Sequence, residues 1–168
     1  LCFWNTATNE EQIKKELEPM IPLWRFNQGS SLAAGASDYI HVMDVQTGEH
    51  KWGARSLSWV TALAFSPESD LLATGHEDGK VRLWDLKNKK PIAEVYLSKL
   101  GVSALAFKPD GLEIAVATED CSITLLEIKG LKQVGKLVGH KDRIPSMVWS
   151  PEGGRLYSAG WDTTVRVW

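Results

Sequence analysis

The sequence predicts an all-β protein: a β-propeller of four-stranded antiparallel blades, with about four blades present. Two observations lead to this prediction. Alternating apolar segments separated by turn signals recur along the chain. In addition, a large apolar residue closes a short apolar run at steps of 39, 41, 42 and 42 residues, namely at Trp4, Met43, Trp84, Leu126 and Trp168. Repetition near 40 residues, with four short strands in each unit, is typical of propeller arrays.

The clearest unit lies between residues 60 and 97. Apolar residues alternate within it and favour strands rather than helices. Ser66-Pro67 and Glu77-Asp78-Gly79 are turn signals that end the first and second strands. The four predicted strands of this unit are 60–65, 70–75, 80–85 and 92–97.

The same pattern recurs downstream and, more weakly, upstream. The downstream copies predict strands at 102–107, 112–117 and 122–127, and again at 144–149, 155–160 and 164–168. The upstream copy predicts strands at 21–26, 31–35 and 39–44. We therefore treat residues 1–168 as one propeller segment with repeats at approximately 5–44, 45–85, 86–127 and 128–168.

The charged segment 10–18 has the composition of a helix. However, Trp4 and Phe26 are 22 residues apart, as are Met43 and Phe65. The segment therefore occupies the place of an outermost strand, where its charges would prevent edge pairing. A one-turn helix is the alternative.

Composition gives weaker indications. The chain is 43% hydrophobic and 24% charged, with a net charge of −2, so no basic surface indicates nucleic acid or a membrane as a partner. Cys2 and Cys121 form neither a disulfide framework nor a metal-binding spacing. We expect a cytoplasmic protein without a cofactor or metal.

The motifs Gly139-His140, Ser158, Asp162 and Trp168 resemble a WD repeat, and the resemblance extends over nearly all of the chain. It implies a hydrogen-bonded set in which His140, Ser158, Asp162 and Trp168 hold one blade together.

The other units keep only part of this set. The unit that ends at Trp84 keeps Thr74 and Asp78 but has Ser56 in the place of the histidine. The next unit keeps only Asp120, and the first keeps only Asp38.

Residues 1–4 match residues 165–168, so the chain begins and ends within third strands. Propellers of the family that this chain resembles often have about seven blades. We therefore expect an internal fragment of a longer propeller. The alternative is that two copies assemble into an eight-bladed ring.

An enzymatic function is not expected. His140, Ser158 and Asp162 are the residue types of a hydrolytic triad, but no glycine elbow accompanies them. The resemblance to a WD repeat accounts for all three. His76 is expected to lie in a solvated turn rather than to bind a metal.

Trp59 and Trp161 have no role in the repeat. The resemblance places both on the face with which such propellers commonly bind partners, and exposed aromatic residues often anchor protein interfaces. Their companions on this face would be Glu77, Glu119 and Arg143. The alternative is that Trp161 packs on a neighbouring loop.

The most favoured function is therefore a non-enzymatic scaffold that binds a protein or peptide through this loop face. The alternative is a regulatory or sensor module of a larger signalling protein, whose catalytic domain lies outside this chain.

Overall fold

The computed structural model describes residues 2–5, 8, 10–14, 23–29, 31–67 and 70–168. These residues form 17 β-strands and no helix, which confirms the predicted all-β class. The strands build five antiparallel sheets, of which three have four strands, one has three and one has two.

Each sheet is a meander of consecutive strands, as expected for propeller blades. The two-stranded sheet contains β1 (Cys2–Asn5) and β2 (Glu10–Lys14). The first blade contains β3 (Leu23–Phe26), β4 (Leu32–Ala36), β5 (Tyr39–Asp44) and β6 (His50–Arg55). The second contains β7 (Val60–Phe65), β8 (Leu71–His76), β9 (Lys80–Asp85) and β10 (Lys90–Tyr96).

The two remaining sheets follow the same plan. The third blade contains β11 (Val102–Phe107), β12 (Glu113–Thr118), β13 (Ser122–Glu127) and β14 (Lys132–Val138). The fourth contains β15 (Ser146–Trp149), β16 (Leu156–Ala159) and β17 (Val165–Val167). Strand β15 begins after Pro145, which has no backbone N–H to donate, and so starts two residues later than predicted.

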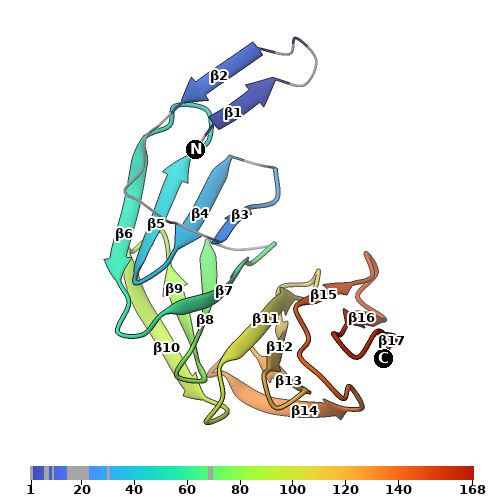
Figure 1. The fold of residues 1–168 in the computed structure, drawn as a ribbon. Helices are drawn as coiled ribbons and strands as arrows, with labels where there is room; N and C mark the ends of the chain where they lie inside the picture. The colour runs from blue at the N-terminus through green and yellow to red at the C-terminus, as the bar shows by residue number, and fades with distance from the viewer. Residues whose placement is uncertain (1, 6–7, 9, 15–22, 30, 68–69) are drawn as a thin grey trace.

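The blades follow one another along an arc, with β3, β7, β11 and β15 on its inner side (Figure 1). Successive inner strands contact each other. The outermost strands β6, β10 and β14 lie on the outside of the arc (Figure 1). Loops that connect equivalent strands therefore lie on the same face of successive blades.

The segment 10–18 forms a strand where the structure describes it. Strand β2 pairs with β1 in antiparallel register, with Asn5 opposite Glu10. The prediction of an outermost strand is therefore confirmed for residues 10–14, and residues 15–18 lie outside the described part of the chain.

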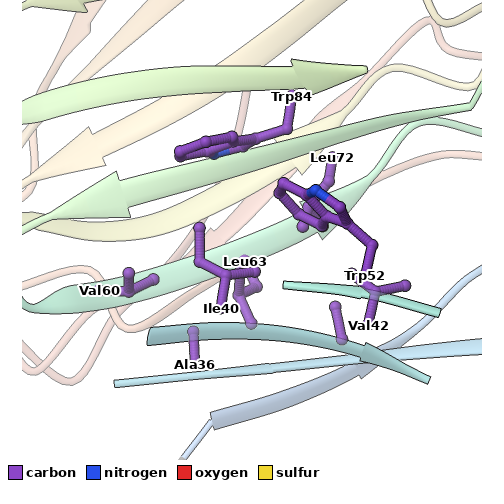
Figure 2. Packing of buried hydrophobic residues seen from close by; sticks show 9 residues of the cluster. Ala36, Ile40, Val42, Trp52, Val60, Leu63, Leu72 and Trp84 are labelled. Atoms are coloured by element: carbon purple, nitrogen blue, oxygen red, sulfur yellow. The ribbon is translucent and has the colours of Figure 1, made fainter. Parts of the chain in front are cut away.

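Apolar side chains fill the spaces between blades. Between the first and second blades, Ile40 and Val42 pack with Val60, Leu63 and Leu72 (Figure 2). Burial of this kind stabilises a domain by about 25 cal/mol per Å² of apolar surface. Further clusters join the second blade to the third and the third to the fourth.

Trp52 is buried although it lies on the outer strand β6, with only 8% of its surface exposed. Its ring lies 5.5 Å from that of Trp84 (centroid to centroid), which belongs to the next blade (Figure 2). An outer-strand side chain is buried here because the neighbouring blade covers it.

Candidate protein-interaction face

Three equivalent backbone hydrogen bonds build one face of the propeller. In the second, third and fourth blades, the turn between the second and third strands donates to the loop that enters the first strand. The bonds run from Glu77 N to Trp59 O at 3.0 Å, from Glu119 N to Gly101 O at 2.9 Å, and from Trp161 N to Arg143 O at 2.8 Å. The interaction face is defined here as Trp59, Glu77, Glu119, Arg143 and Trp161.

At one end of this face, three of the five residues contact each other. The Cζ atom of Arg143 lies 5.4 Å from the ring centroid of Trp161, within the range of a cation–π interaction. Nη1 of Arg143 also lies 3.6 Å from Oε1 of Glu119. Arg143 therefore connects the fourth blade to the third.

Trp161 was expected either to be exposed for a partner or to pack on a neighbouring loop, and the structure shows both. It packs on Arg143 of the adjoining loop, yet 62% of its surface is exposed. A large aromatic ring that is held by a cation and open to solvent on its other side is ready to contact a partner.

Trp59 forms the other end of the face, and Glu77 lies next to it. Trp59 is 44% exposed and Glu77 is also exposed. Gly101 joins the two ends: a Cβ atom placed there would lie 3.4 Å from Cα of Glu77 and 3.7 Å from Cδ of Glu119. The face therefore runs across three blades, with Glu77 and Glu119 both next to Gly101 in its middle.

In the fourth blade, a chain of hydrogen-bonded side chains holds the loops of the face in place. Nδ1 of His140 lies 2.8 Å from Oδ2 of Asp162, and Nε2 lies 2.8 Å from Oγ of Ser158. The indole N–H of Trp168 donates to the same Ser158 oxygen at 2.9 Å. The four residues thus tie the entry loop to the second and third strands.

Asp162 also fixes the turn that carries Trp161. It accepts hydrogen bonds from the backbone N–H of Lys141 at 2.9 Å and from the hydroxyl of Thr164 at 2.7 Å. The Lys141 backbone N–H is the largest cause that holds the pKa of Asp162 well below its usual range, with Thr164 and His140 adding to it.

This arrangement does not suit hydrolysis. Ser158 is 1% exposed, and its hydroxyl is already shared by His140 and Trp168. A nucleophile must reach its substrate, and this one cannot. No group of three His, Cys, Asp or Glu residues that could hold a metal exists in the described part of the chain.

In the second blade the structure corrects the expectation for His76. This histidine is not in a solvated turn but at the end of β8, with 0% of its surface exposed. Its Nε2 lies 2.7 Å from Oγ1 of Thr74, and its Nδ1 lies 3.1 Å from Oγ of Ser56. Trp84 donates from its indole N–H to Thr74 at 2.9 Å.

Burial is the main cause that lowers the pKa of His76 to about 4, and the charge of Arg82 adds to it. The ring is therefore neutral near pH 7. A signal for this role was present in the sequence: Ser56 leaves the usual histidine place unfilled, and His76 follows Thr74 by two residues on a buried strand.

Asp78, which was expected in the same set, caps its own turn instead. Its Oδ1 accepts from the backbone N–H of Lys80 at 3.1 Å, and its Oδ2 lies 3.3 Å from Nη2 of Arg82. The third blade replaces the polar set with apolar packing, because Val116 and Leu126 are both 0% exposed.

Comparisons with known proteins agree with this geometry. The family model described as "WD domain, G-beta repeat" matches residues 50–85 and 131–168. The protein ROOT INITIATION DEFECTIVE 3 of Arabidopsis thaliana is 34% identical over 90 residues, which are 51% of this chain and 20% of that protein.

Two further relatives match this chain with a similar sequence identity. Human THO complex subunit 6 is 33% identical over 73 residues, which are 43% of this chain and 21% of that protein. The poly(A)+ RNA export protein of Schizosaccharomyces pombe is 34% identical over 86 residues, which are 47% of this chain and 24% of that protein. The matched part of this chain thus spans about a quarter or less of each relative.

These relatives overturn one expectation. We expected a cytoplasmic protein, and this is wrong, because two of these relatives are named for the THO complex and for the export of poly(A)+ RNA, which are nuclear settings. The absence of a nucleic-acid partner stays a prediction. No helix in the described residues is long and apolar enough to cross a membrane.

Proposed function

Because this chain belongs to the WD-repeat β-propeller family, we propose that it is a non-enzymatic scaffold that binds a protein or peptide through its interaction face. The observation that carries the proposal is the stack of Arg143 on Trp161 beside Glu119. This arrangement holds a large aromatic ring in place while it remains 62% exposed.

The rigidity of the face favours binding. Its turns are fixed by backbone hydrogen bonds and by Asp162, so little conformational entropy is lost when a partner orders the side chains. Two tryptophans at its ends and two glutamates at its centre offer apolar anchors around an acidic middle. A basic partner segment with apolar flanks matches this pattern.

The relatives suggest where such a scaffold works. One of them is a subunit of the THO complex and another is a poly(A)+ RNA export protein. We therefore propose that this chain acts in a nuclear multiprotein complex. The side chains considered for catalysis or metal binding are compatible with a scaffold role, since all of them make structural hydrogen bonds: His140, Ser158, Asp162 and His76.

The test is affinity capture of partners with the double variant Trp59→Ala/Trp161→Ala. Both residues are exposed, so we expect an unchanged Tm together with a loss of most of the captured partner, measured by quantitative mass spectrometry. Tyr96→Ala is the matched control, because Tyr96 is 55% exposed on β10 and outside the face. Equal recovery of partners by the double variant and the control would sink the proposal.

A further inference from the structure

A groove of about 380 Å³ lies where the end of the first blade meets the outer strands of the second. Arg55 and Leu57, at the end of β6 and in the loop after it, form one side. Arg82 of β9, with Ile92 and Glu94 of β10, forms the other side. The groove contains none of the five residues of the interaction face.

A β-bulge shapes the apolar part of this groove. The register between β10 and β9 shifts between Pro91 and Ala93, so Ile92 is the extra residue and is left unpaired. Ile92 is 46% exposed and Leu57 is 91% exposed. Two large apolar side chains therefore face solvent at the groove, although water is a poor environment for both.

The polar part contains a buried donor that lacks a partner. The side chain of Arg82 is 8% exposed, with its Nε 2.5 Å from Oε2 of Glu94 and its Nη2 3.3 Å from Oδ2 of Asp78. Its Nη1 is buried and has no hydrogen-bond partner among the described residues. A buried guanidinium N–H without an acceptor is unfavourable, so Arg82 keeps hydrogen-bonding capacity that the described residues do not use.

The charges around the groove indicate which kind of ligand group would bind there. Glu94 is already paired, because Oε1 contacts Nζ of Lys80 at 2.7 Å while Oε2 contacts Arg82. The exposed Arg55 adds a further positive charge at the groove. A carboxylate fits this site best, because guanidinium groups bind carboxylates through short, charge-assisted hydrogen bonds.

We propose that this groove binds an acidic segment of a protein partner. The segment would place an aspartate or glutamate against Arg82 and Arg55, and a neighbouring leucine or phenylalanine against Leu57 and Ile92. The scaffold would then hold two partner elements at once, one on the interaction face and one at the edge of the ring.

The probes are Gly-Ser decapeptides with a central Leu-Asp or Phe-Asp pair, and matched peptides with Asn in place of Asp. Binding is followed through the indole N–H resonances, since Trp84 lines the groove and Trp161 lies on the interaction face. We expect the acidic peptides to shift the Trp84 signal and leave that of Trp161 unchanged. The Asn peptides should bind about tenfold more weakly, because they lose the charged hydrogen bond.

Two exposed variants test the same site without disturbing the core. Leu57→Ser and Arg55→Glu should each weaken binding of the acidic peptides by about tenfold or more. Leu112→Ser and Arg155→Glu are the matched controls, since both residues are exposed outside the groove, and they should bind normally.

Three results would overturn the proposal: no shift of Trp84 with any acidic peptide, equal affinity of the Asp and Asn peptides, or unchanged affinity in the two groove variants. A ten-nucleotide oligoadenylate serves as a separate probe. If it shifts Trp84 and the peptides do not, the groove binds phosphate of RNA instead. Because Trp84 and Trp161 report separately, the result stands or falls independently of the interaction face.

Discussion

Oγ of Ser56 lies 3.1 Å from Nδ1 of His76, and this contact shows how the second blade keeps a histidine in its hydrogen-bonded chain. In the fourth blade the imidazole comes from the entry loop, at His140. In the second blade the entry loop supplies only the hydroxyl of Ser56, and the imidazole comes from β8. Both chains end on an indole N–H that donates to a hydroxyl, from Trp84 to Thr74 in the second blade.

The chain in the second blade closes with a neutral imidazole. Ser56 donates to the carbonyl of Ser58 at 2.5 Å, so its oxygen accepts from Nδ1–H of His76. Nε2 is then free to accept from the hydroxyl of Thr74. This assignment agrees with a pKa of His76 lowered to about 4.

The first prediction concerns acid stability. The pKa of His76 is about 4 in the folded state and 6.5 without the fold. Between pH 6.5 and 4, His76 therefore binds a proton in the unfolded chain but not in the folded chain. The stabilisation that is present above pH 6.5 is lost as the pH falls to 4. We expect the free energy of unfolding, measured with urea, to fall by about 3 kcal/mol across this window.

His76→Gln should be less stable than the wild type at pH 8 and should lose most of this pH dependence. His50→Gln changes an exposed histidine on β6 and should keep it. If the slope between pH 6.5 and 4 is the same in His76→Gln and the wild type, His76 is not the group responsible.

The second prediction compares two turn aspartates. Asp162 accepts from His140, Lys141 and Thr164, and so joins the entry loop to the turn. Asp120 accepts from Thr118 and Ser122, which lie within two residues of it. Asp162→Ala should therefore lower the Tm more than Asp120→Ala, as scanning calorimetry would show. Equal losses would mean that the contacts to the entry loop add nothing.

The third prediction uses two glycines with positive φ. Gly79 has φ +74, and a Cβ atom there would collide with the backbone carbonyl of Ser98. Gly130 has φ +85 with no atom within 4 Å of such a Cβ. Gly130→Ala should cost about 1 kcal/mol through backbone strain alone. Gly79→Ala should cost roughly 3 kcal/mol or more, because the turn must also move. Urea unfolding of the pair measures both, and similar costs would refute the steric argument.

Much of the fold could be predicted because its signals are local. Periodic apolar runs and turn residues predicted β5, β7, β9, β11 and β13 with the bounds that the structure shows. The burial of Trp52 could not be predicted in this way, since the neighbouring blade that covers it is remote in sequence.

The site was predictable only in part, for a similar reason. Positions within the repeat placed Trp59 in an entry loop and Trp161 in a turn between the second and third strands, both on the same face. They could not predict the stack of Arg143 on Trp161, which depends on side-chain conformations. The role of His76 was not predicted because the repeat pattern places the histidine in the entry loop, whereas His76 lies on β8. The groove at Arg82 was missed because it requires a bulge at Ile92 and the contact of two blades.

The last prediction separates binding from stability at the centre of the interaction face. Glu119 and Arg143 lie 3.6 Å apart with side chains 41% and 37% exposed, so their ion pair should add less than about 1 kcal/mol to folding. Glu119→Gln should therefore leave the Tm nearly unchanged. A charge at an interface acts mainly on partner association, so capture of the native partner should become weaker and less dependent on salt. Glu127→Gln, an exposed glutamate at the end of β13, is the control. A clear loss of Tm in Glu119→Gln with normal capture would show that this carboxylate serves the fold and not the partner.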